Sequence, residues 1–331
     1  MRISDLRIEV RRRLLGFAWD QWAQMGVSAA PHRADRWAAD PEALLLFTFE
    51  VARADARLFD EVLDWMAGNE RLVSVQRLRN LCRDEMDRSL AESALAWVAQ
   101  SRSKTRPGPS LASAEHPPTL ALFRAFTADP QRADVAFKDH GWLKPPTERS
   151  GKSQAPNLFA PINFAFRLRN VLGIGARAEV ARFLLTVVAP SATAQVVAES
   201  AGYAKRNVHE ALTSFSSAGV IRAVTVGNEQ RYNIDRDGWA ALLGLPADQL
   251  PTERSWPQLL HALRRLARWL EDEQRDNLSP YLLASEARTL AENVVPELRY
   301  AGVRTPAGGR PGAEYWQDFV DLVHAALADL G

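Results

Sequence analysis

Cysteine is almost absent from this 331-residue sequence, because Cys82 is the single one and no disulfide can form within the chain. An unpaired cysteine is typical of a reducing compartment. Long apolar runs are missing too: residues 43–47, the densest stretch, fall far short of the roughly 18 residues that span a bilayer. Residues 1–13 are interrupted by charged side chains, unlike a secretory signal. These absences predict a cytoplasmic protein without a membrane partner.

Glycine and proline are sparse, with 18 and 19 residues, which excludes collagen-like and low-complexity chains. The hydrophobic share of 47% and the charged share of 24% are those of an ordinary globular protein. At roughly 100–200 residues per domain, the length predicts two or three domains with enough apolar material for a core.

Net charge is also nearly absent, at +1, but the charges are unevenly distributed. Residues 1–137 carry 19 basic and 19 acidic side chains, whereas residues 138–236 carry 13 basic and 7 acidic ones, an excess of +6. Residues 237–331 carry 9 basic and 14 acidic side chains, a balance of −5. A basic middle segment between neutral and acidic flanks indicates a polyanionic partner for that segment.

The distribution of periodic stretches predicts a mainly α protein in four segments. Residues 1–143 form a helical N-terminal domain, in which Asp40 and Pro41 mark a helix start. Residues 144–156 are a polar linker. Residues 157–236 contain a central domain with a small β-hairpin, and residues 237–331 form a helical C-terminal domain.

Residues 176–235 give the most informative pattern. An apolar helical stripe runs over residues 180–187, and a short helix follows over residues 194–201, with Thr193 as its expected cap. Gly202 allows a tight turn into a third helix over residues 204–218, which Gly219 ends. Residues 220–226 and 230–234 are β-rich and are joined by a turn at residues 227–229.

This order of helix, short helix, turn, helix and hairpin resembles the winged helix-turn-helix domains of bacterial transcription regulators of the MarR- and ArsR-like kind. The resemblance covers about 60 of the 331 residues. It is carried by residues 196–202 at the turn, by residues 207–212 in the third helix and by residues 217–221 before the hairpin. Tyr203 departs from the pattern, because a small hydroxyl residue usually starts the third helix. The resemblance implies binding of double-stranded DNA and regulation of transcription.

The residue types on the third helix suit that function. If its apolar residues at positions 208, 212 and 215 face inward, polar side chains line the outward face, and arginine and asparagine match base edges in the major groove best. We expect Arg206 and Asn207 to contact bases, and Lys205 to contact phosphates together with the two hairpin arginines. The candidate DNA-binding residues are Thr193, Lys205, Arg206, Asn207, His209, Thr213, Arg222 and Arg231.

Other motifs predict no further chemistry. Residues 151–153 match the last three residues of a phosphate-binding loop motif, but no strand precedes them and the upstream glycine of the motif is absent. Residues 173–178 fit a loose dinucleotide-binding pattern, and residues 162–168 before them alternate as a strand would, yet no second βαβ unit follows. The six histidines are scattered, without metal-ligand spacing. We expect no cofactor, no metal and no catalytic residues.

Two alternatives to DNA binding stay open. The winged helix can be a protein-interaction module, for instance an antitoxin-like or scaffold partner of a neighbouring enzyme. The chain can also be a helical enzyme whose site leaves no pattern in the sequence. For the regulator, we expect a homodimer on two half-sites. Its pairing surface is predicted on the apolar stripe of the C-terminal block, made of Leu259, Leu263, Leu266, Trp269 and Leu270.

Overall fold

A computed structural model of the chain describes residues 1–29, 37–102, 119–126 and 128–330. It is mainly helical, with 63% helix and 7% strand, which confirms the predicted fold class at that level. The first half contains α1 (Ile3–Gln24), α2 (Pro41–Val51), α3 (Ala56–Asn69), α4 (Val75–Leu81), α5 (Glu85–Arg102), β1 (Leu120–Ala121), α6 (Val135–Lys138) and β2 (Trp142–Leu143).

The second half begins with α7 (Phe164–Leu172) and α8 (Ala176–Thr186) and continues with β3 (Ala192–Thr193), α9 (Ala194–Ala201), α10 (Lys205–Ser217), β4 (Ile221–Val226), β5 (Glu229–Ile234) and α11 (Arg236–Leu243). It ends with α12 (Trp256–Leu270), α13 (Pro280–Tyr300) and α14 (Tyr315–Ala328). Short 3-10 helices η1–η6 cover Ala52–Ala54, Glu70–Leu72, Pro161–Asn163, Ala247–Gln249, Glu273–Asn277 and Gly312–Glu314.

The N-terminal and C-terminal helices share one hydrophobic core. Buried side chains of α1–α5 form a single cluster with those of α12, α13 and α14. Helix α12 packs against α2 and α13, and α14 packs against α13 and α1. The sequence predicts residues 1–143 and 237–331 as separate domains, but α1–α6 and α12–α14 share this core, whereas Ala240 and Leu243 of α11 do not belong to it. We call α1–α6 together with α12–α14 the helical body.

The predicted pairing surface on α12 is buried within the chain, which corrects the predicted position of a dimer interface. Leu259, Leu263, Leu266 and Leu270 are at most 1% exposed, and Trp269 is partly buried against Phe319 of α14. An amphipathic helix has the same sequence pattern whether its apolar face packs inside one chain or between two. The prediction that two chains pair through this stripe is therefore wrong, and a homodimer would need another surface.

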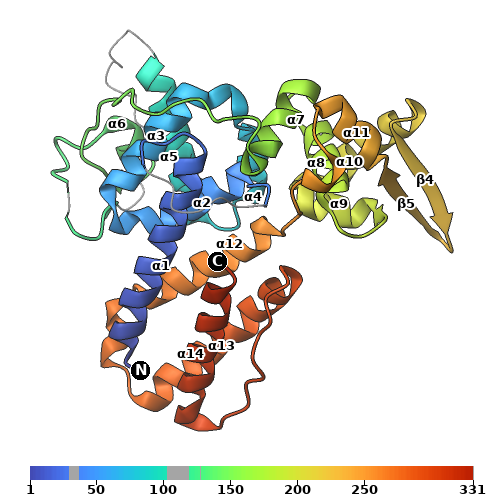
Figure 1. Cartoon of the computed structure of the whole chain (residues 1–331). Coiled ribbons are helices and arrows are strands. Elements are labelled where there is room, and N and C mark those ends of the chain that lie inside the picture. Colours follow the sequence, from blue (N-terminus) through green and yellow to red (C-terminus); the bar gives the residue numbers. More distant parts are fainter. Residues whose placement is uncertain (30–36, 103–118, 127, 331) are drawn as a thin grey trace.

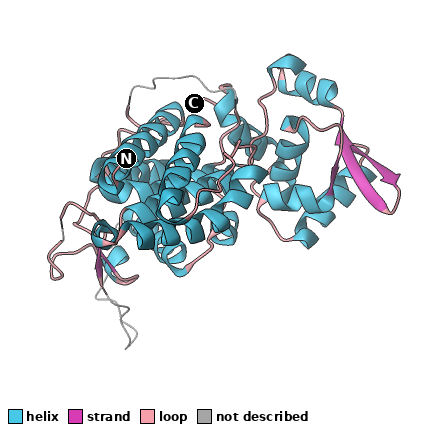
Figure 2. Ribbon diagram, turned by 90° about the horizontal axis from the view of Figure 1, so that it is seen from below, coloured by secondary structure: helices cyan, strands magenta, loops and turns pink. Residues whose placement is uncertain are grey.

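A second core holds the central segment together. It gathers buried side chains of α7–α11 and of the strands, with Ala38 and Leu250 from the flanking chain. The strands form an antiparallel sheet of order β3-β5-β4, in which β4 and β5 make the hairpin. In Figure 1 this segment, from α7 to α11, lies beside the helical body, and the hairpin projects from its outer edge. Figure 2 shows the same hairpin at the end of the molecule away from both termini.

The structure also shows what the predicted linker and the alternating stretch before α7 form. Residues 144–156 contain neither helix nor strand, yet they are held on α3, because the N–H groups of Gly151 and Ser153 donate to the Asp64 carboxylate at 3.0 and 3.3 Å. These N–H groups are therefore engaged by a carboxylate of the chain itself. The alternation over residues 162–168 is not a strand, because this stretch is η3 followed by α7.

Candidate nucleic-acid interface

Helix α9 has the predicted bounds, and α10 begins and ends one residue inside the predicted range of 204–218. Thr193 caps α9, since its Oγ1 accepts a hydrogen bond from the Val196 N–H at 3.4 Å. Gly202 follows α9 with φ +68°, a left-handed conformation that glycine adopts without steric cost. Helix α10 then begins at Lys205, and its N-cap, Ala204, makes no side-chain cap. The turn between the two helices is therefore three residues long.

Helix α10 separates its apolar and polar faces cleanly. Val208, Ala211, Leu212 and Phe215 are buried, at 0–6% exposure, against the second core. Five of the predicted DNA-binding side chains are exposed on the opposite face, and these are Lys205, Arg206, Asn207, His209 and Thr213. Ser214 and Ser217, which were not among the predicted residues, extend this face toward the end of the helix. The apolar spacing of α10 was the signal that predicted the face.

The hairpin brings three further candidates close to one another. In the sheet Thr193 is the register partner of Arg231, and Arg222 is the partner of Asn233. Because alternate residues of a strand share a face, Arg222 and Arg231 lie on the same side of the β4–β5 pair in diagonal positions. Arg222 is exposed, whereas Arg231 is half-buried. Thr193 therefore adjoins Arg231, whereas Arg222 lies on β4, with β5 between it and Thr193.

Acidic side chains reduce the positive charge of this surface. Arg206 forms an ion pair with Glu210 at 3.0 Å, one turn along the exposed face, and Arg231 lies 3.6 Å from Glu229. The spacing of Arg206 and Glu210 by four residues is the sequence signal for the first of these pairs. Within residues 138–236, Lys144, Arg169 and Arg182 are buried, so the +6 excess is only partly a surface property. The sequence charge therefore overstates the positive charge at the surface of this segment.

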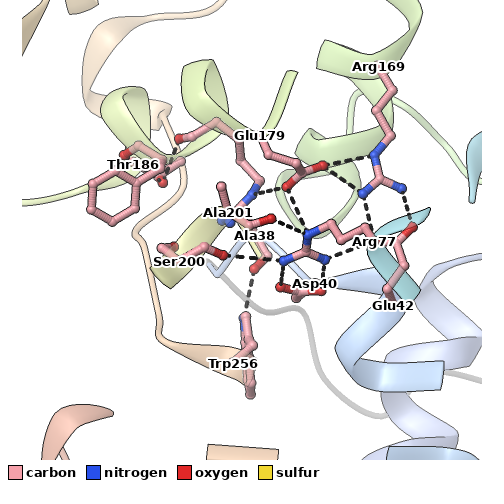
Figure 3. Close-up of polar contacts among 12 residues, drawn as sticks. Ala38, Asp40, Glu42, Arg77, Arg169, Glu179, Thr186, Ser200, Ala201 and Trp256 are labelled. Atoms are coloured by element: carbon pink, nitrogen blue, oxygen red, sulfur yellow. Dashed lines mark hydrogen bonds and ion pairs between the residues drawn. The ribbon is translucent and has the colours of Figure 1, made fainter. Parts of the chain in front are cut away.

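Arg169 and Arg182, the two buried arginines of the central segment, belong to a buried charge cluster at its junction with the helical body. Figure 3 shows Arg169 and Arg77 with the carboxylates of Glu42, Glu179 and Asp40. The cluster contains three guanidinium groups and four carboxylates, from Asp40, Glu42, Arg77, Arg169, Glu179, Arg182 and Glu253. Arg169 bridges Glu42 and Glu179 at 2.7 and 2.6 Å. Arg182 bridges Glu179 and Glu253 at 2.9 and 2.6 Å. These ion pairs join α2 and α4 of the body to α7 and α8.

Burial and ion pairing oppose each other within the buried charge cluster. Burial alone would raise the pKa of Asp40, but the Arg77 guanidinium outweighs it and holds this pKa below the usual range. Burial likewise disfavours the charged form of Glu179, yet Arg169, Arg77 and Arg182 lower its pKa well below normal. The pKa of Arg77 is raised despite burial, because Asp40 and Glu179 stabilise its charge. Asp40, Glu179 and Arg77 are therefore all charged at neutral pH.

Cys82 has the environment of an inert thiol. It is half-buried, and its Sγ donates to the carbonyl of Leu78 at 3.4 Å. Burial raises the pKa of this thiol to about 11. Since the thiolate is the nucleophile, we expect iodoacetamide at pH 8 to alkylate Cys82 in the native protein about a hundredfold more slowly than free cysteine. Mass spectrometry of the time course measures this rate, and the urea-unfolded chain is the control. Equal rates in both states would contradict the inert environment.

Neither a metal centre nor a membrane span is found in the part of the chain that the structure describes. No group of three or more histidine, cysteine or acidic side chains is placed there to hold a metal ion. His32 and His116 lie outside the described residues. No helix among the described residues combines the length and the hydrophobicity needed to cross a bilayer. In searches with the whole chain, no protein-family model, no curated protein and no solved structure matches it.

Proposed function

We propose that residues 176–234 form a winged helix-turn-helix that binds double-stranded DNA, with α10 in the major groove and the β4–β5 hairpin as the wing. Three features support the assignment: the order of elements α8, β3, α9, α10, β4 and β5, the three-residue turn after α9, and the antiparallel sheet order β3-β5-β4. A helix of this size fits the major groove, where base edges present distinguishable donors and acceptors. Transcription regulation is the proposed biological role.

The observation that carries the proposal is the outward face of α10. It presents two cationic side chains, Lys205 and Arg206, together with Asn207, His209 and Thr213 to solvent, and it carries no apolar side chain among them. Lysine, arginine and asparagine donate hydrogen bonds to phosphates or to base acceptors. Tyr203 takes no part in this face, because it is buried at 8% exposure and its hydroxyl lies 2.7 Å from Ser74 Oγ.

Substitutions on this face test the proposal. We expect Arg206→Ala and Asn207→Ala to weaken binding to a specific site by about 1–3 kcal/mol, because each side chain reads a base, and to leave binding to random DNA nearly unchanged. Lys205→Ala should weaken both kinds of binding alike, since a phosphate contact carries no sequence information. Fluorescence anisotropy with the DNA upstream of the chain's own gene, beside a shuffled duplex, measures these affinities.

A matched control is Arg12→Ala. Arg12 is exposed on α1, which packs against α12, α14 and α2 rather than against the central segment, so the same charge is removed far from the hairpin. This variant should bind both duplexes as the unaltered chain does. Equal losses on specific and shuffled DNA for Arg206→Ala would show that Arg206 contacts phosphate and does not read sequence. Failure of the unaltered chain to bind any duplex at low salt would refute the proposal.

One observation favours the alternative of a protein-interaction module. The face of the hairpin that carries Arg222 and Arg231 also carries Val224 and Val226, at 52% and 54% exposure, and Leu242 of α11 is 70% exposed. A wing that enters the minor groove usually presents arginine or lysine there. Replacing both valines by threonine separates the two functions. DNA affinity should stay unchanged, whereas a protein partner held by these side chains would be lost.

A further inference from the structure

The short helix α4 of the helical body contacts every residue from 200 to 203, which span the end of α9 and the turn before α10. Arg77 donates to the carbonyls of Ser200 and Ala201, with Nη2 and Nε at 3.3 and 2.6 Å. Asn80 Nδ2 donates to the carbonyl of Gly202 at 3.1 Å. Ser74, the N-cap of α4, shares a 2.7 Å hydrogen bond with the hydroxyl of Tyr203.

The three contacting residues share one face of α4. Ser74, Arg77 and Asn80 follow one another at intervals of three residues, which places them along one side of a helix. They act on four consecutive residues, the last two of α9 and the first two of the turn, so the chain is held from residue 200 to residue 203. Lys205, Arg206 and Asn207 directly after it are nevertheless exposed. The contact therefore holds the turn without covering the outward face of α10.

Arg77 is itself firmly anchored in the body. Its guanidinium forms a bidentate ion pair with Asp40 and reaches Glu42 Oε2 at 2.9 Å. Arg77, Asp40 and Glu42 are at most 2% exposed, and Figure 3 shows Arg77 between the two carboxylates. A charged side chain with every donor group engaged in a buried site has little freedom to change rotamer. The turn is thus tied through Arg77 to α2 as well as to α4.

Gly202 shows how closely the two parts approach. A Cβ atom added at this position would lie 3.0 Å from Leu81 Cδ2 and 3.2 Å from Arg77 Nε. Gly219, at the other end of α10, has almost the same backbone conformation, with φ +70° against +68°, but nothing lies within 4 Å of an added Cβ. Alanine at either position would therefore be strained in the same way by the backbone, but only alanine at position 202 would also press against α4.

We propose that α4 is a clamp that positions the recognition helix, with Ser74, Arg77 and Asn80 as positioning residues for DNA binding. The DNA part of this inference rests on the function proposed above, whereas the clamp itself does not. A tethered domain would orient α10 independently of the body, but here any shift of α4 moves the turn from which α10 begins. The helical body then sets the orientation of the DNA-reading face.

The experiment uses variants of the full chain that leave the buried charges paired. Asn80→Ala combined with Tyr203→Phe removes two of the contacts, and Val75→Ala is the control, because Val75 is an exposed residue of α4 with no contact to the turn among those described. Gly202→Ala and Gly219→Ala form a second pair that shares the backbone strain. Hydrogen exchange is measured without DNA at the amides of residues 202 and 208, which donate to the carbonyls of Ala198 and Ala204, and affinity is measured on specific and shuffled duplexes.

The clamp predicts a clear ordering of results. Asn80→Ala/Tyr203→Phe should speed exchange of the amides of residues 202 and 208 about tenfold. It should weaken specific binding at least fivefold and leave binding to shuffled DNA unchanged, because attraction to phosphates depends on charge rather than on orientation. Gly202→Ala should speed exchange more, and weaken specific binding more, than Gly219→Ala does. Val75→Ala should match the unaltered chain in both measurements.

The contrary outcomes are separable. Unchanged exchange in the double variant, or equal effects at the two glycines, overturns the clamp. Faster exchange with intact specific binding overturns the positioning role and leaves DNA binding standing. If the unaltered chain binds no DNA while exchange follows the predicted order, the clamp is supported and the proposed function fails.

Discussion

Replacing Arg77 by methionine is expected to lower the free energy of unfolding by about 3–5 kcal/mol, because removing one partner of a buried ion pair strands the other. Arg77 is fully buried and is the guanidinium that binds Asp40, while Glu42 would keep Arg169 as its partner at 2.7 Å. The carbonyls of Ser200 and Ala201 would also lose their donors. Urea unfolding at pH 7, followed by circular dichroism, measures the change.

Arg79→Met is the matched control for this prediction. Arg79 lies on the same helix and pairs with Glu92 at 2.7 Å, but its side chain is 53% exposed, so the same substitution should cost less than about 1 kcal/mol. Similar losses for the two variants would show that the charge of Arg77 is not critical.

The stranded carboxylate can be tested separately. Asp40→Asn removes the charge and keeps the cap of α2, since asparagine also accepts the hydrogen bond that Ala43 N–H donates to Asp40 Oδ1 at 3.0 Å. Added to Arg77→Met, it should cause little further loss or restore part of the stability, because the two side chains act as one unit. Additive losses would contradict the assignment of the effect to an unpaired Asp40.

The local architecture of the central segment could be predicted because its signals are close together in the sequence. Thr193 caps α9, Gly202 and Gly219 take left-handed conformations, and the buried stripe of α10 is the one that its apolar spacing indicated. Each of these signals acts through neighbours within one or two helical turns. Sequence therefore predicted the elements and the exposed face of α10 almost to the residue.

The contacts between segments could not be predicted in the same way. Arg77 meets Asp40 across 37 residues, and Arg169 meets Glu42 across 127. In a sequence, an arginine that forms a buried ion pair looks the same as one that is free to bind phosphate. Arg169 and Arg182 were for this reason counted toward a basic surface, although their partners lie elsewhere in the chain. The α4 clamp was missed for the same reason.

Salt dependence of DNA binding should be measurable but moderate, because the proposed interface holds few unpaired cations. Each phosphate contact contributes a log–log slope of about −0.9. Lys205 and Arg222 have no ion-pair partner among the described residues, whereas Arg206 and Arg231 have one each. If the paired arginines stay with their carboxylates, the slope is about −1.8. If Arg231 and, instead of contacting a base, Arg206 bind phosphate as well, the slope is about −3.6. Raising salt from about 50 to 200 mM then weakens binding roughly 10-fold to 150-fold.

Glu210→Gln distinguishes these limits. It removes the exposed carboxylate that pairs with Arg206 on α10. An interface with DNA should therefore gain affinity, and its log–log salt slope should become steeper by about 0.9, the value for one further charge contact. Glu229→Gln should act in the same direction through Arg231 on the hairpin. Anisotropy titrations at several salt concentrations give both quantities. A flat salt response that neither substitution alters would exclude phosphate contact by this face and would favour the exposed valines of the hairpin as the binding surface of a protein partner.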